Sequence, residues 1–130
     1  MKILIVEDEF TSRVILEKIL SHYGEVHQCV NGREGVEAFT AALARGEPFD
    51  LVCLDVMMPE MDGPEALIMI RDIEEKQGSP RRQGTKVVMT TGHNGSEGDL
   101  EAVKSLSDAV ISKPVRLQDL IWTLTTLGLI

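Results

Sequence analysis

Five short apolar runs alternate along this sequence with five segments of helical periodicity, and this alternation constrains the fold more than any other feature. The runs predict strands, and the segments between them, where apolar residues recur every three or four positions, predict helices. The expected strands are Lys2–Val6, Glu25–Val30, Asp50–Asp55, Lys86–Thr91 and Asp108–Ser112. The expected helices are Thr11–Tyr23, Arg33–Ala44, Glu65–Gln77, Gly95–Leu106 and Leu117–Leu127.

This order of elements predicts the α/β class: a parallel sheet with helices on both faces, joined by right-handed crossovers. The segment Asp50–Asp55 is nearly all apolar before its final residue, as is typical of a parallel strand covered on both faces. Ligands of such sheets bind beyond the carboxyl ends of the strands, where the strand order reverses. The residues that directly follow each strand are therefore the candidates for function.

Composition narrows the class of protein further. A length of 130 residues predicts one domain, residues 1–130, with enough chain for a hydrophobic core. A net charge of −8 disfavours direct nucleic-acid binding, and no apolar stretch approaches the 18 residues of a membrane span. The first strand reaches Glu7 too soon for a signal peptide. Cys29 and Cys53 both lie in expected strands, so we expect reduced, buried thiols in a cytoplasmic protein.

Carboxylates close two of the expected strands. Glu7 and Asp8 follow the first strand, and Asp55 ends the third. Because parallel strands end at one edge of the sheet, we expect negative charge to gather there, and like charges repel unless a cation shares them. The sequence thus predicts a hard divalent metal site, with a solvated loop face as the alternative for Glu7 and Asp8.

Two further polar residues follow strands at the same edge. Thr91 ends the fourth strand, and Lys113, before Pro114, follows the fifth. A carboxylate beside a magnesium site can act as a nucleophile toward a phosphoryl group, a reaction that needs positioning and charge neutralisation above all. In this interpretation Asp55 is the nucleophile, Lys113 the counter-charge and Thr91 a hydrogen-bond donor.

At this point the sequence resembles the receiver domain of two-component response regulators, similar to the chemotaxis regulators. The segments that carry the resemblance are Ile5-Val6-Glu7-Asp8-Glu9, residues 55–63 (Asp-Val-Met-Met-Pro-Glu-Met-Asp-Gly), Met89-Thr90-Thr91-Gly92 and Ser112-Lys113-Pro114. The resemblance implies a flavodoxin-like three-layer sandwich, whose five-stranded sheet has the order 2-1-3-4-5 with five helices.

The resemblance also implies chemistry and partners. Asp55 would accept a phosphoryl group from a histidine of a sensor kinase or phosphotransfer protein. Mg²⁺ would be held by the carboxylates of Glu7, Asp8 and Asp55 and by the backbone carbonyl of Met57, while Thr91 and Lys113 would respond to the phosphoryl group. A receiver of this kind is a switch for a downstream protein target rather than a turnover enzyme, and is expected to be a monomer or weak dimer.

One position departs from the family that the chain resembles. Its members usually carry an aromatic residue three positions before the lysine, and here that position is Val110. We therefore expect phosphorylation to be read out mainly by backbone and loop shifts around Thr91–Gly95. Met57 and His93, each two residues beyond a strand-end residue, should overhang the pocket, at positions similar in placement to those that tune loss of the phosphoryl group in the family. For His93 an ordinary loop histidine is the simpler interpretation.

Three local expectations concern helices and loops. Thr11 or Ser12 is placed to cap the first helix, and Pro64 suits the first turn of the third. In the last helix an apolar stripe is expected to be buried, with Trp122 almost opposite as an exposed candidate for partner binding. The stripe consists of Leu117, Leu120, Ile121, Leu124 and Leu127. Arg81-Arg82 most simply form a solvated patch, with a protein contact as the alternative.

Two other functions are weaker interpretations. A magnesium-dependent phosphatase with an aspartyl-phosphate intermediate would need a second Asp two residues after the nucleophile, where this chain has Met57. A flavodoxin-like cofactor protein would need a phosphate-binding loop after the first strand, where Glu7 and Asp8 would repel phosphate. The sequence ends at Ile130, just after the last expected helix, so we expect either a stand-alone receiver without an effector domain or a fragment of a longer regulator.

Overall fold

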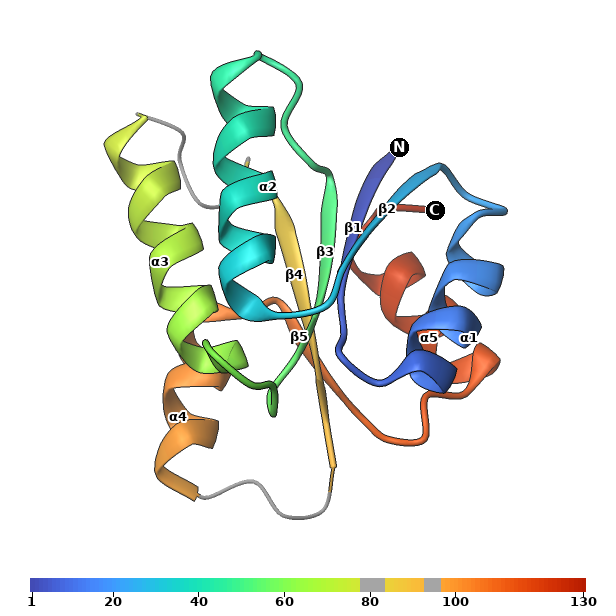
Figure 1. Ribbon diagram of the computed structural model, residues 1–130. Helices are drawn as coiled ribbons and strands as arrows, with labels where there is room; N and C mark the ends of the chain where they lie inside the picture. Colours follow the sequence, from blue (N-terminus) through green and yellow to red (C-terminus); the bar gives the residue numbers. More distant parts are fainter. Residues whose placement is uncertain (78–83, 93–96) are drawn as a thin grey trace.

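The computed structural model describes residues 1–77, 84–92 and 97–130, and within them strands and helices alternate as the periodicity predicts (Figure 1). The strands are β1 (Lys2–Val6), β2 (Glu25–Cys29), β3 (Leu51–Asp55), β4 (Lys86–Thr91) and β5 (Ala109–Ser112). The helices are α1 (Phe10–Leu20), α2 (Gly32–Ala44), α3 (Gly63–Lys76), α4 (Glu97–Leu106) and α5 (Leu117–Thr126).

The five strands form one parallel sheet in the order β2-β1-β3-β4-β5, so the predicted fold class and strand order are confirmed. Helices α2, α3 and α4 cover one face of the sheet, and α1 and α5 cover the other (Figure 1). The chain reverses its direction of winding between β1 and β3. The carboxyl ends of these two neighbouring strands therefore border the crevice in which ligands bind in sheets of this kind.

Alternate residues of the central strands supply the two cores, because successive side chains of a strand point to opposite faces. In β1, Leu4 and Val6 pack in the core beneath α2 and α3, whereas Ile3 and Ile5 pack in the core beneath α1 and α5. All five residues of β3 are buried. The central strands are thus fixed from both sides, and they hold the residues at their ends in place.

Two helices begin with a side-chain cap, and α1 does not begin where it was expected to. Asn31 caps α2 and Asp62 caps α3, each side chain accepting a hydrogen bond from a backbone N–H three residues on at 2.9 Å. Pro64 lies in the first turn of α3, as predicted. The expectation that Thr11 or Ser12 caps α1 is wrong, because the helix begins at Phe10 and both residues lie inside it.

The apolar stripe expected on α5 is only partly buried. Leu120 and Leu124 are fully enclosed in the core, and Trp122 is 70% exposed, as expected from its place opposite the stripe. Leu117 is 56% exposed and belongs to neither core, so that expectation is wrong. The difference arises because Leu117 opens the helix, ahead of the turns that pack on the sheet. Other element ends differ from prediction by one to three residues.

Both cysteines are free thiols, as predicted. Burial raises the pKa of Cys53 to about 12, and burial with the nearby charges of Glu34 and Glu37 raises that of Cys29 to about 11. These thiols are therefore inert components of the core at neutral pH. Among the helices in the described part of the chain, none has the length and apolar character needed to cross a bilayer.

Candidate functional site

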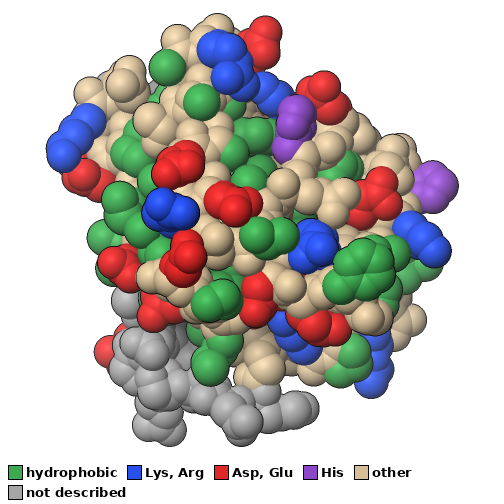
Figure 2. Space-filling model, in the orientation of Figure 1, with side chains coloured by type: hydrophobic (Ala, Val, Ile, Leu, Met, Phe, Trp, Pro, Cys, Tyr) green, Lys and Arg blue, Asp and Glu red, His purple; other side chains and the backbone are tan. Residues whose placement is uncertain are grey.

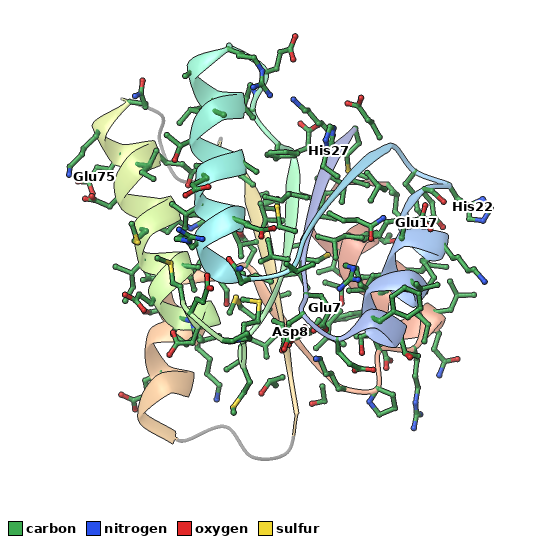
Figure 3. All side chains as sticks on the ribbon, in the orientation of Figure 1. Glu7, Asp8, Glu17, His22, His27 and Glu75 are labelled. Carbon is green, nitrogen blue, oxygen red and sulfur yellow. The ribbon has the colours of Figure 1, made fainter. Side chains whose placement is uncertain are left out.

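Three carboxylates meet at the carboxyl ends of β1 and β3. Glu7 and Asp8 directly follow β1, and Asp55 is the last residue of β3. Each offers an oxygen that lies within 4.8 Å of the oxygens of the other two. Figure 3 labels Glu7 and Asp8 at the lower end of β1, where the strand turns toward α1. The side chains of Glu7 and Asp55 are buried, with 1% and 4% exposed, whereas Asp8 is open to solvent.

Lys113 supplies a positive charge to the two buried carboxylates. Its Nζ lies 2.8 Å from Glu7 Oε1 and 3.1 Å from Asp55 Oδ2. The lysine follows β5, and the peptide bond between it and Pro114 is cis. Its backbone N–H donates to the carbonyl of Thr91 at 2.8 Å, which ties the end of β5 to the end of β4. One ammonium therefore faces three carboxylates, and the cluster has an excess of negative charge.

The charges of the cluster shift the pKa of Glu7 and the pKa of Lys113. The pKa of Glu7 is raised, first by burial and then by its contact with Asp55, and these effects outweigh the contacts with Lys113 and the Glu9 N–H that lower it. Burial lowers the pKa of Lys113, but its contacts with Glu7 and Asp55 outweigh burial, so the net shift is upward. The lysine stays charged at neutral pH, whereas the crowded carboxylates favour any added cation.

The donor set fits a hard divalent cation. Glu7 Oε1 is fully buried and lies 2.8 Å from the Lys113 ammonium, which it shares with Asp55. A single ammonium leaves the negative charge of the three carboxylates incompletely balanced. Mg²⁺ and Ca²⁺ prefer oxygen ligands, and Mg²⁺ usually binds through one or two carboxylates while it keeps several waters. Glu7, Asp8 and Asp55 offer such a set.

Met57 and Thr91 lie beside this cluster but contact it differently. The backbone N–H of Met57 donates to Asp55 Oδ1 at 3.3 Å, and its side chain is 62% exposed. Thr91 is nearly buried at the end of β4, and its hydroxyl donates to the carbonyl of Gly92 at 3.0 Å. In this structure the hydroxyl is therefore engaged with the main chain of its own loop.

The loop after Asp55 is held close to the sheet by a glycine. The N–H of Gly63 donates to the carbonyl of Val56 at 2.9 Å, and a Cβ at Gly63 would lie 2.2 Å from the carbonyl oxygen of Asp55. Within the same loop Glu60 has a φ of 67°, a conformation that costs energy in a residue with a side chain. The backbone on both sides of Asp55 is thus tightly constrained.

Of the remaining positions named from the sequence, Val110 packs against the core, and the others lie outside the described residues. Val110 is half-buried and packs against the core on the α2 and α3 side of the sheet. His93 and the pair Arg81-Arg82 lie outside the described residues. Sequence reasoning missed Arg13, whose guanidinium Nη1 donates to the carbonyl of Glu7 at 3.0 Å. An arginine inside an amphipathic helix carries no signal of such a contact.

Acidic side chains spread over the centre and lower part of the face shown in Figure 2, with hydrophobic side chains between them. With this site in view, a comparison of the sequence with known families decides the classification. The model of the family described as response regulator receiver domain matches residues 3–125. The chain belongs to this family. Receiver domains are typically signalling switches rather than turnover enzymes.

Curated relatives of this receiver include histidine kinases. It is 35% identical over 123 residues to histidine kinase CKI1 of Arabidopsis thaliana and 33% identical over 131 residues to hybrid signal transduction histidine kinase G of Dictyostelium discoideum. These matches cover 86% and 98% of this chain but only 11% and 4% of the kinases. The receiver thus spans a small part of the length of these relatives.

Solved structures share the fold over nearly the whole chain. The receiver domain of CKI1 from Arabidopsis thaliana complexed with Mg²⁺ and BeF3⁻ matches with a TM-score of 0.81 and 29% identity, covering 98% of this chain and 89% of that one. A CheY-like receiver domain protein from Methanospirillum hungatei matches with a TM-score of 0.77 and 28% identity, covering 98% and 93%. Both are receivers, as the family match requires.

Proposed function

We propose that this receiver, a single domain over residues 1–130, accepts a phosphoryl group on Asp55 from a phosphohistidine and thereby changes its binding surface. The observation that carries the proposal is the environment of Asp55: a buried carboxylate at the end of β3, 3.1 Å from the Lys113 ammonium and grouped with Glu7 and Asp8. The relatives that are histidine kinases support a histidine-bearing donor, either a sensor kinase or a phosphotransfer protein.

The reaction depends on a divalent cation, for which Mg²⁺ is the candidate. The carboxylates of Glu7, Asp8 and Asp55 and the backbone carbonyl of Met57 would hold it. When bound, the ion neutralises charge on the transferring phosphoryl oxygens. A related receiver has been crystallised with Mg²⁺ and BeF3⁻, which are the two kinds of ligand, a divalent cation and a small anion, that the proposal requires here.

The chain's own groups carry out the transfer. A carboxylate oxygen of Asp55 attacks phosphorus, the P–N bond of the phosphohistidine breaks, and its electron pair stays on the imidazole nitrogen, which takes a proton from solvent. The N–H of Met57 holds Asp55 Oδ1 and so orients the carboxylate. Lys113, already 3.1 Å from Asp55 Oδ2, supplies positive charge to the incoming phosphoryl oxygens.

Phosphorylation then acts through charge. It adds about 1.5 to 2 negative charges and three acceptor oxygens at Asp55. The Thr91 hydroxyl leaves the carbonyl of Gly92 to donate to the phosphoryl group, and the backbone that links Thr91 to Lys113 moves with it. Because Val110 has no ring to relocate, this backbone shift at the end of β4 is the main readout toward a downstream protein.

The test is incubation with acetyl phosphate or a small phosphoramidate, with and without Mg²⁺, followed by intact-mass measurement. We expect the wild type to gain one phosphoryl group only with Mg²⁺, and Asp55→Asn to gain none. Asp119→Asn, which alters an exposed carboxylate of α5, is the matched control and should be phosphorylated normally. Absence of uptake from both donors, or normal uptake by Asp55→Asn, would contradict the proposal.

A further inference from the structure

The segment that joins β1 to α1 holds two of the three clustered carboxylates, yet its helix begins without a side-chain cap. Glu9 occupies the N-cap position and makes no capping hydrogen bond. Its backbone N–H instead donates to Glu7 Oε2 at 3.3 Å. The main chain of Glu7 is tied to β2, because its N–H donates to the carbonyl of Cys29 at 3.1 Å. Contact between this segment and the first turn of the helix therefore depends on side chains, since helix ends leave backbone groups unsatisfied and loops are mobile.

Arg13 makes that connection from inside the helix. Its Nη1 donates to the carbonyl of Glu7 at 3.0 Å and lies 3.4 Å from the carbonyl of Asp8. Its own backbone N–H donates to the carbonyl of Glu9 at 3.0 Å, as part of the first helical turn. A single side chain thus contacts the main chain of both residues whose carboxylates lie in the cluster, while its backbone is fixed by α1.

The guanidinium of Arg13 also contacts an aromatic ring. Its guanidinium carbon lies 5.6 Å from the centroid of the Phe10 ring, within the range of a cation–π contact. Phe10 is 69% exposed, so its ring is not accounted for by core packing. A planar guanidinium held against a ring loses little further conformational freedom when it hydrogen-bonds, which suits it to hold two carbonyls in a fixed place.

We propose that Arg13 is a positioning residue for the divalent cation: it fixes the main chain of Glu7 and Asp8 so that both carboxylates face Asp55. The inference rests on the cation site of the proposed function and adds a residue outside the carboxylate set. Groups that orient metal ligands without touching the metal typically alter metal affinity by about 10- to 100-fold when they are removed.

When Arg13 is replaced, the loss of its charge and the loss of its positioning contacts predict opposite changes in Mg²⁺ affinity. Removing a positive charge near an acidic cluster should by itself strengthen the binding of a divalent cation. Removing the hydrogen bonds to the Glu7 and Asp8 carbonyls should weaken it. The sign of the change in Mg²⁺ affinity therefore separates the two effects, and a variant that keeps the charge but lacks the planar guanidinium separates them a second time.

The experiment is an Mg²⁺ titration of the unphosphorylated full chain. Binding is measured by the backbone amide NMR shifts of residues 7–9 and, independently, by calorimetry. We expect Arg13→Met and Arg13→Lys each to raise the Mg²⁺ dissociation constant by about tenfold. Lys18→Met, which removes an exposed charge from the same helix, is the matched control and should bind Mg²⁺ slightly more tightly than the wild type or equally well. Urea unfolding in metal-free buffer checks that each variant is folded.

Two results would overturn the proposal. One is Arg13→Met binding Mg²⁺ as tightly as the wild type or more tightly, and the other is Arg13→Lys matching the wild type. If Arg13→Met fails to fold, Arg13→Lys carries the test, and its unchanged affinity overturns the proposal. Phe10→Leu, which removes the ring beside the guanidinium, should also weaken Mg²⁺ binding. Failure of the proposed function looks different, because the wild type itself would then show no saturable Mg²⁺ binding at residues 7–9.

Discussion

At the amino-terminal end of the sheet, Arg71 of α3 forms a buried ionic cluster with Glu74 and Asp108, which we call the Arg71 cluster. Its guanidinium donates to Glu74 Oε1 at 2.7 Å, to Asp108 Oδ2 at 2.8 Å, and to the carbonyls of Thr85 and Leu106 at 2.8 and 2.9 Å. The second oxygen of Glu74 accepts from the N–H of Thr85 at 2.8 Å. Both oxygens of its most buried carboxylate are therefore satisfied by protein groups.

The cluster at the carboxyl end of the sheet, formed by Glu7, Asp8, Asp55 and Lys113, is built differently. A single ammonium, itself partly exposed, pairs with Glu7 and Asp55, and Asp8 adds a third carboxylate to the group. Both clusters contain buried charges, so burial of charge alone does not mark a functional site. What distinguishes the carboxyl-end cluster is its excess of negative charge, which a divalent cation can balance.

The largest expected effect concerns the Arg71 cluster. Arg71→Met leaves Glu74, which is 3% exposed, without a countercharge, and removing one partner of a buried ion pair costs about 3–5 kcal/mol. Urea unfolding should show this loss in free energy of unfolding, with no recovery when Mg²⁺ is added. Lys76→Met, which breaks an exposed pair with Asp72 on the same helix, should cost far less than Arg71→Met, because exposed ion pairs contribute little. Equal losses in the two variants would contradict the role assigned to Arg71.

A smaller loss is expected at the carboxyl-end cluster, and it should respond to metal. Lys113→Met removes the ammonium that pairs with Glu7 and Asp55, but protonation can relieve part of the resulting repulsion, so we expect a loss of about 1–3 kcal/mol in metal-free buffer at neutral pH. Adding Mg²⁺ should restore part of that free energy of unfolding. A loss that Mg²⁺ leaves unchanged would show that the two clusters do not differ in the way described.

The sequence predicted the carboxyl-end cluster but not the Arg71 cluster, for a physical reason. Glu7, Asp8 and Lys113 follow strands and Asp55 ends one, and in a parallel sheet that local signal is enough to predict proximity. The Arg71 cluster was not predicted, because Arg71 meets Asp108 at a separation of 37 residues and no local pattern records that contact.

The fold class was predictable for the same reason, since strand and helix periodicities are local signals, whereas the strand order came from the resemblance to receiver domains. Details that depend on how an element ends were not. Leu117 shares the periodicity of a buried stripe but lies at the exposed first turn of α5. Thr11 and Ser12 have the chemistry of caps, yet α1 begins before them. The hydrogen bond from Arg13 to the Glu7 carbonyl depends on the conformation of residues 7–9, which join β1 to α1.

A third effect is expected in the pH dependence of the carboxyl-end cluster. The pKa of Glu7 is raised above its ordinary value of 4.5, chiefly by burial and by Asp55, so the folded state binds this proton more tightly than the unfolded state. The resulting stabilisation is present below about pH 4.5 and is lost as pH rises through the raised pKa. Relative to Glu7→Gln, metal-free wild type should lose stability over that range, by at most about 1.4 kcal/mol per pH unit.

Urea unfolding at a series of pH values measures this difference, and Mg²⁺ should reduce it because the ion favours ionised Glu7. The Arg71 cluster provides the contrast: Glu74→Gln should show no comparable dependence on Mg²⁺ at any pH. Parallel stability curves for the wild type and Glu7→Gln in metal-free buffer would contradict the raised pKa.

The most direct test of the central claim, that the carboxyl-end cluster is completed by a divalent cation, is the free energy of unfolding of the wild type and Asp8→Asn with and without Mg²⁺ at neutral pH. At an Mg²⁺ concentration about ten times its dissociation constant, binding to the folded state should stabilise the wild type by about 1.4 kcal/mol. Asp8→Asn, which removes an exposed carboxylate of the cluster, should gain far less. Equal stabilisation of the two proteins, or none in the wild type, would contradict the account.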